Sequence, residues 1–313
     1  MLMAHRLNNL GGESADEPPL IAHLAEVTPI APVSEPAAPR PDAITPRKAR
    51  GIAPRTLLTW LLSAISLAVL ITAWHVAVKY KLDFYIRFNN IPSPGAVFDD
   101  AANLFGNARF QRHVGLSLRR IITGFSVAAV LAIPLGLLLG RNRVARELIF
   151  PALEILRPIP AIAWVPMSIM LWPSNEVSIV FITFLGSFFP ILLNTIQGVQ
   201  SLDKVLVRAA RSLGAGQLAL FWHVVLPGSL PQVFTGLTIG MGVAWVSLIA
   251  AEMISGQFGI GYFTWEAYSL VRYSEIVLGM IVIGVLGLLC SGVIRLIGGW
   301  LMPWVARQNQ ETS

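Results

Sequence analysis

Two charged side chains, Glu252 and Arg157, stand inside apolar stretches of the sequence, "WVSLIAAEMIS" and "EILRPIP". Ionisable groups in such stretches are costly when the stretch crosses a membrane, and they usually serve a purpose. Glu252 lies near the end of its stretch, so we expect a structural role for it, either pairing with a nearby arginine or capping a turn. Arg157 could attract an anion, or extend its charged head to the lipid headgroups.

Other chemistry finds little support in the sequence. His75, His113 and His223 are isolated, and a single cysteine, Cys290, supports neither a disulfide framework nor a cysteine-rich metal site. No nucleophile stands beside a base. The chain lacks a Gly-x-x-x-x-Gly-Lys-Ser/Thr loop for ATP, and the glycines of "GQFGIGYF" are better interpreted as a re-entrant turn. We therefore expect no enzyme activity, no metal ion and no cofactor.

The composition is that of a membrane protein. Of 313 residues, 55% are hydrophobic and only 13% are charged, whereas soluble domains carry about 25% charged residues. The mean hydropathy is +0.66. Several apolar runs reach the roughly 20 residues that cross a bilayer as a helix. The net charge of +6 is explained by Lys and Arg at the ends of spans rather than by nucleic acid. The lipid bilayer is the expected surrounding.

The apolar runs predict an all-α polytopic protein with about six transmembrane helices. Residues 1–50 are rich in proline and predict a disordered tail. Residues 51–118 contain the first span and an external segment, residues 119–302 form the core, and residues 303–313 form a short tail. The positive-inside rule predicts that both termini are cytoplasmic. The expected spans lie at about 57–78, 121–140, 148–172, 176–199, 231–254 and 276–300.

A polar loop at 200–230 interrupts the core with the sequence "VRAARSLGAGQLALFWHVVLPGSLPQ" at its centre. Its first part predicts a short helix, Gly214 and Gly216 permit a sharp turn, and "QLALFWHVVL" has helical spacing. Pro227 should end that second helix, because proline cannot donate the next backbone hydrogen bond. Such a loop is either a plain amphipathic connector at the headgroup layer or a docking surface for a soluble protein.

The spacing in this loop resembles the "EAA" motif of importer permeases of the ATP-binding cassette superfamily. That motif is Glu-Ala-Ala, three residues, Gly, nine residues and Ile-x-Leu-Pro. Arg208 stands where the family usually has glutamate. The residues that carry the match are Ala209, Ala210, Gly214, Val224, Leu226 and Pro227.

The resemblance extends over roughly residues 85–300. "SLRRIITGF", "LRPIPAIAWVPMSIMLW" and "GLTIGMGVAWVSLIAAEMI" are similar to permeases of the nitrate, sulfonate, taurine and bicarbonate group. After Trp172, this chain has "PSNEVS" where the family usually has Phe-Gly-x-Gly. The group has the MetI-like fold of type I importers, so the resemblance implies that fold here.

The resemblance also implies function and partners. It implies a homodimeric permease of the bacterial inner membrane that works with a dimer of ATPase subunits and an external, periplasmic solute-binding protein. ATP hydrolysis would belong to the partner, and the coupling residues would be Arg208, Ala209, Ala210, Gly214, Leu226 and Pro227. The cargo would be a small anion. A sulfonate such as taurine or an alkanesulfonate is favoured by the arginine-first loop, and nitrate, cyanate and bicarbonate stay open.

In the family, span five lines the central path, and here it has two faces. A stripe of small residues suits close helix packing: Gly236, Gly240, Ala244, Ser247, Ala251 and Ser255. We expect the opposite face to line the path, with Thr238, Gly242, Trp245 and Glu252, together with Arg157 of span three. The alternatives are a self-contained secondary transporter or channel, for which neither mid-span ion-coupling residues nor inverted repeats are visible, and an intramembrane enzyme, which would need a catalytic set.

Overall fold

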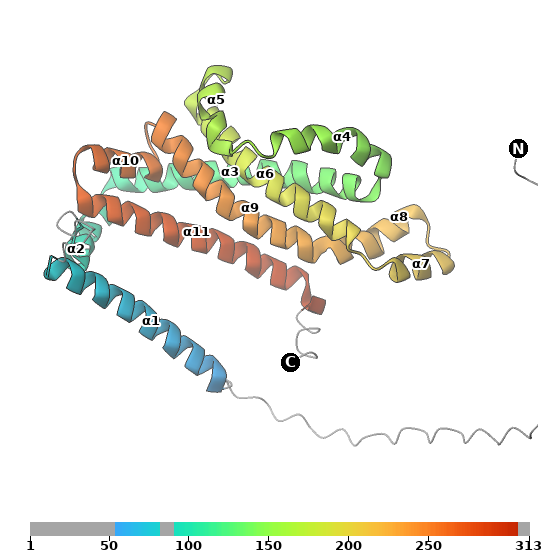
Figure 1. Cartoon of the computed structure of the whole chain (residues 1–313), viewed down its shortest axis with the longest axis horizontal. Coiled ribbons are helices and arrows are strands. Elements are labelled where there is room, and N and C mark those ends of the chain that lie inside the picture. The colour runs from blue at the N-terminus through green and yellow to red at the C-terminus, as the bar shows by residue number, and fades with distance from the viewer. Residues whose placement is uncertain (1–53, 82–90, 306–313) are drawn as a thin grey trace, which may run out of the picture. The chain divides into compact units, whose positions relative to one another are not determined.

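The computed structural model describes residues 54–81 and 91–305, and the regular elements in these residues are all helices. The predicted all-helical membrane fold is confirmed. The predicted tail at 1–50 and most of the one at 303–313 lie outside the described residues. The helices, labelled in Figure 1, are α1 (Pro54–Lys79), α2 (Pro94–Phe105), α3 (Ala108–Arg141), α4 (Arg143–Leu156), the 3-10 turn η3 (Ala161–Trp164), α5 (Val165–Leu171), α6 (Asn175–Gln200), α7 (Lys204–Ser212), α8 (Gln217–Leu220), the π turn η4 (Phe221–Val225), α9 (Leu226–Ser255), α10 (Ile260–Ser269) and α11 (Tyr273–Leu301).

Among the described residues, five helices are long and apolar enough to cross a membrane. The predicted span at 148–172 is not one straight helix, and this corrects the sequence-based expectation. Its place is taken by the pair Arg143–Leu156 and Ala161–Leu171, which bends by 81°. Pro158 and Pro160 lie in the break. Each lacks a backbone N–H, and each disfavours helical geometry at the residue before it, so the helix cannot continue through them.

Helix α3 begins earlier than the sequence suggested. The amphipathic segment before the predicted span at 121–140 is continuous with it, so α3 runs for 34 residues from Ala108. The Asn107 side chain caps the start by accepting a hydrogen bond from the Arg109 amide at 2.8 Å. The first three turns of α3 therefore extend the span toward the segment that the sequence predicts to be external.

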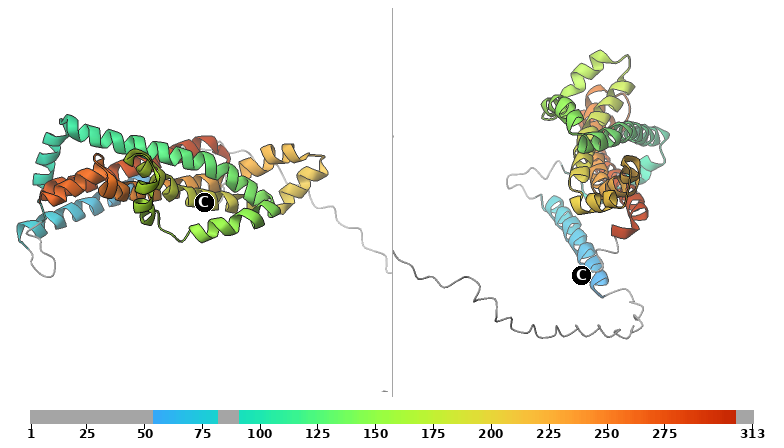
Figure 2. Two further views of the ribbon diagram at one scale, coloured as in Figure 1. Left: turned by 90° about the horizontal axis from the view of Figure 1, so that it is seen from above. Right: turned by 90° about the vertical axis from the view of Figure 1, so that its right-hand side faces the viewer.

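The core is built around α6, which packs against α3 and α9 (Figures 1 and 2). Glycines allow these helices to approach closely. A Cβ atom added at Gly136 of α3 would lie 2.6 Å from the Cβ of Thr195, and one added at Gly236 of α9 would lie 2.7 Å from the Cβ of Asn194. The small-residue stripe of span five is buried along its whole length, which confirms its predicted packing role.

The core has two ends that are far apart along the helices. At the Glu252 end, α9 finishes beside the start of α6, where the Asn175 side chain donates to the Ser255 carbonyl at 2.9 Å. At the loop end, α3 finishes, α4 begins, and α7 and α8 lie beyond the core helices (Figure 1). Glu252 and the loop that the sequence marked for coupling therefore lie at opposite ends.

Candidate functional site

The first half of the interrupted loop is helix α7, and its ends are well defined by local hydrogen bonds. Asp203 caps the start by accepting from the Val205 amide at 2.7 Å. At the other end, the Ala215 amide donates to the Ala210 carbonyl at 3.0 Å, and the Gly214 amide donates to the Arg211 carbonyl at 2.9 Å. Gly214 has a φ of +83°, so this is a Schellman motif that requires glycine. The predicted turn at Gly214 is confirmed.

The second half of the loop does not end at Pro227, contrary to our expectation. Helical structure continues from Gln217 to Ser255, and Pro227 lies in the first turn of α9. The π turn at Phe221–Val225 explains this, because the Leu226 amide bonds to the Phe221 carbonyl, five residues back. A π turn shifts the hydrogen-bond pattern by one residue. The helix can therefore continue although Pro227 has no N–H to donate.

This continuous helix is longer than a bilayer requires. It contains 39 residues, whereas roughly 20 residues cross the hydrocarbon core. The part before α9 carries the helix past the ends of the core helices, where α7 lies (Figure 1). The loop thus projects from this end of the core, while its inner side packs against α3 and α6.

The inner side of the loop is fixed to the core. Leu220 and Val225 are buried against Leu137 of α3 and Val199 of α6. Partly buried side chains from the EAA-like pattern and its surroundings pack around this cluster: Val207, Ala210, Val224 and Leu226. A force applied to α7 would therefore reach α3 and α6 through packed side chains.

The outer side of the loop exposes several large apolar side chains. Leu213 is 89% exposed at the tip, and Leu206 and Leu218 are also largely exposed. Arg208 and Ala209 are exposed beside them. Apolar side chains gathered at the tip of a projection are typical of a surface that another protein covers.

The Glu252 end contains a buried ionic cluster. Glu252 is fully buried and Arg120 of α3 is 3% exposed. The Arg120 Nη1 donates to the Glu252 Oε1 at 2.9 Å. The Ser117 hydroxyl donates to the same carboxylate at 2.7 Å, and the Gly261 amide donates to its Oε2 at 3.0 Å. Both carboxylate oxygens are thus occupied, as a buried charge requires.

The cluster fastens three helices and a loop together. Arg120 also donates to Glu176 at the start of α6, through its Nε at 2.9 Å, and to the Phe258 carbonyl at 2.6 Å. Gly259 has a φ of +126°, and a side chain there would collide with the Glu252 carboxylate. The expected pairing of Glu252 with an arginine is present. The sequence did not identify Arg120 itself; its signal is the "SLRR" that precedes an apolar run.

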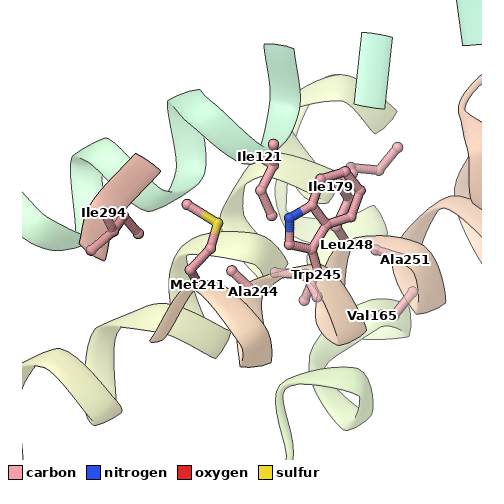
Figure 3. Close-up of a cluster of buried hydrophobic side chains, with 10 residues drawn as sticks. Ile121, Val165, Ile179, Met241, Ala244, Trp245, Leu248, Ala251 and Ile294 are labelled. Atoms are coloured by element: carbon pink, nitrogen blue, oxygen red, sulfur yellow. The ribbon is translucent and has the colours of Figure 1, made fainter. Parts of the chain in front are cut away.

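The predicted pathway residues of span five separate into two groups. Gly242 is exposed and Thr238 is partly exposed. Trp245 and Glu252 are buried inside the chain, and Figure 3 shows Trp245 among Ile179 and Leu248. In the single chain neither presents its side chain to an open surface, and their place on the path stays a prediction.

Arg157 lies at the break between α4 and η3 and is about half exposed. Its Nη1 donates to Glu154 Oε1 at 2.9 Å. It shares the lining of a hollow with Arg146 and Gln200 near the loop end, well separated from Glu252 along the core. A role in attracting anions stays a prediction.

The sequence is similar to a family of transport proteins and to individual members named for the solutes they carry. The family model described as "binding-protein-dependent transport system inner membrane component" matches residues 132–307. The nitrate import permease protein NrtB of Synechocystis sp. is 32% identical, over 77% of this chain and 88% of that protein. The taurine transport system permease protein TauC of Escherichia coli is 32% identical, over 78% and 89%. The bicarbonate transport system permease protein CmpB of Synechococcus elongatus is 38% identical, over 61% and 68%.

Proposed function

Since the chain belongs to the family of binding-protein-dependent transport system inner membrane components, we propose that it is the permease subunit of an ATP-driven importer for a small anion. It has the MetI-like permease fold. In this proposal, a separate ATPase subunit binds the loop at 200–230, and an external solute-binding protein delivers the cargo at the Glu252 end. The termini and the loop then lie on the cytoplasmic side.

One observation carries the coupling part of the proposal. The loop is packed onto α3 and α6 on its inner side and exposes Leu213 and its apolar neighbours on its outer side. A loop that is packed rigidly on its inner side and exposed at its tip can be moved as one unit by a bound partner, and we call this loop at 200–230 the lever. Rigid-body rotation is a common way to switch a transporter between states. Arg208, Ala209, Ala210, Gly214, Leu226 and Pro227 belong to this lever.

The cargo class rests on the relatives. Two of them are named for the anions nitrate and bicarbonate, and one for taurine, which carries a sulfonate. We favour a sulfonate because of the arginine-first loop, with nitrate and bicarbonate as the other candidates. The homodimer is what the family resemblance implies, and in this proposal the second copy faces the exposed side of α9 that holds Ile239, Val243 and Val246, beside Thr238 and Gly242.

The coupling proposal is tested by co-purification in detergent with the ATPase subunit. Leu213→Asp should reduce the amount of ATPase recovered by about tenfold or more, because a carboxylate cannot enter an apolar pocket without a partner. The control is Phe98→Asp, since Phe98 is 74% exposed and lies in α2, outside both the loop and the candidate spans. A secondary transporter or channel would purify without an ATPase, and that result would overturn the proposal.

The cargo is tested by uptake in cells that lack this chain. Labelled taurine, nitrate and bicarbonate are compared before and after the chain is restored. Restoration of taurine uptake alone is the expected result, and restoration of only one of the other anions would replace it. If none of the three responds while ATPase recovery is normal, the anion proposal is wrong and the coupling proposal stands.

A further inference from the structure

A large pocket opens at the loop end, between the end of α3 and the π turn, with a volume of about 860 Å³. Its walls are apolar: Pro134 and Leu138 of α3 on one side, and Phe221 and Trp222 on the other. Two arginines, Arg141 and Arg143, also line it. The pocket thus combines an apolar interior with a cationic rim.

The position of this pocket in the membrane follows from the helices that form it. Pro134 and Leu138 belong to the apolar run of α3, and Arg141 is the last residue of that helix. The apolar walls therefore lie within the hydrocarbon layer and the arginines at its boundary. Trp222 is about half exposed at the same level, and tryptophan is enriched at membrane interfaces. Water in this pocket would lie against apolar walls, which is unfavourable.

The two arginines keep donors free for a ligand. Arg143 uses its Nε to contact Glu147 at 2.7 Å, and Arg141 uses one Nη to contact Gln217. A guanidinium has five N–H donors, so most of them stay available at the rim. No acidic residue lines the pocket. Lys204, Arg208 and Arg211 line the hollow next to it, which Arg141 shares, and none of the three forms an ion pair among the described residues.

We propose that this pocket binds an anionic phospholipid, with its phosphate held by Arg141 and Arg143 and an acyl chain along Leu138 and Trp222. Basic pockets between helices on the cytoplasmic side are suited to anionic headgroups. Because one wall is the end of α3 and the other is the π turn that carries the loop, the lipid would join the lever to the core. The proposal goes beyond the transport function and does not depend on the identity of the cargo.

The test uses the full-length chain in vesicles, with lipids whose acyl chains carry bromine, which quenches nearby tryptophan fluorescence. The contribution of Trp222 is obtained as the difference between the wild type and Trp222→Phe. We expect brominated phosphatidylglycerol to quench this contribution at lower mole fraction than brominated phosphatidylcholine. Arg141→Gln and Arg143→Gln should each weaken the preference roughly fivefold, the usual effect of one cation near an anionic surface. Arg146→Gln is the control, because Arg146 lies on α4 but lines a different hollow.

Each other outcome points to a different occupant and overturns the proposal. Equal quenching by the two lipids would mean that the rim does not select charge. Absence of quenching by either lipid would mean that protein, such as a second copy of this chain, fills the pocket. Loss of the preference in a few millimolar inorganic phosphate, at constant ionic strength, would assign the arginines to a free anion instead of a lipid headgroup.

Discussion

Arg120 of α3 and Glu252 of α9 form a fully enclosed ion pair, with the Arg120 Nη1 2.9 Å from the Glu252 Oε1 and at most 3% of either side chain exposed. The two residues lie 132 positions apart in the chain. Their pairing connects the first half of α3 to the last turn of α9 and holds the turn that leads into α10. Glu252 is therefore a structural residue of this end of the core.

Removing one partner of this pair should destabilise the protein strongly. Arg120→Met leaves a buried carboxylate without its cation, and breaking a buried pair in this way costs roughly 3–5 kcal/mol. We expect a large drop in the thermal unfolding midpoint in detergent. Arg272→Met is the control, because Arg272 is exposed and pairs at 3.2 Å with the partly exposed Glu275, and it should cost less than about 1 kcal/mol.

The double variant Arg120→Met with Glu252→Leu distinguishes the charge from the packing. It removes both buried charges, so it should be more stable than Arg120→Met alone, as double-mutant cycles reveal for coupled residues. If the two single substitutions add without any recovery, the two side chains are not energetically coupled, and the structural role assigned to Glu252 is wrong.

Close packing of α3 on α6 should make Gly136 intolerant of even a methyl group. The Cβ of Gly136→Ala would lie 2.6 Å from the Cβ of Thr195, so the helices must move apart and lose contacts. We expect a fall in thermal stability for this variant. Gly115→Ala, in the same helix with nothing within 4 Å, should instead be neutral or stabilising by up to about 1 kcal/mol. Similar midpoints for the two variants would contradict the close approach.

The sequence was sufficient for the features that depend on local composition. Five of the six predicted spans, the all-helical class and the turn at Gly214 follow from hydropathy and glycine placement, which act within a few residues. The continuous helix through Pro227 was not predictable, because the π turn that accommodates it depends on packing of Leu220 and Val225 against α3 and α6. The sequence could not identify Arg120 as the partner of Glu252 either, because an arginine on a distant helix has no fixed spacing from the glutamate along the chain.

The Schellman turn predicts that two nearby glycines of the loop, Gly214 and Gly216, differ sharply in how well they tolerate substitution. Gly214 has a φ of +83°, which β-branched residues adopt only with strain. Gly214→Val should therefore distort the tip of the loop and lower both ATPase recovery and uptake several-fold. Gly216 has a φ of −68° and open space around its Cα, so Gly216→Val should be tolerated. An equal response of both variants would argue against a role for the turn geometry.

The exposed face of α9 supplies the last prediction, which concerns the proposed path. A side chain at Gly242 would meet nothing within 4 Å in the single chain, and Gly242 lies on a face that the chain itself leaves open. If that face lines the path between two copies, Gly242→Trp should reduce uptake by about tenfold or more while leaving the amount of assembled complex unchanged. Gly284→Trp in α11, where the added side chain also meets open space, is the matched control and should transport normally. Normal uptake by Gly242→Trp in an intact complex would mean that the solute passes along another face, because a bulky indole on the path would obstruct a passing ion.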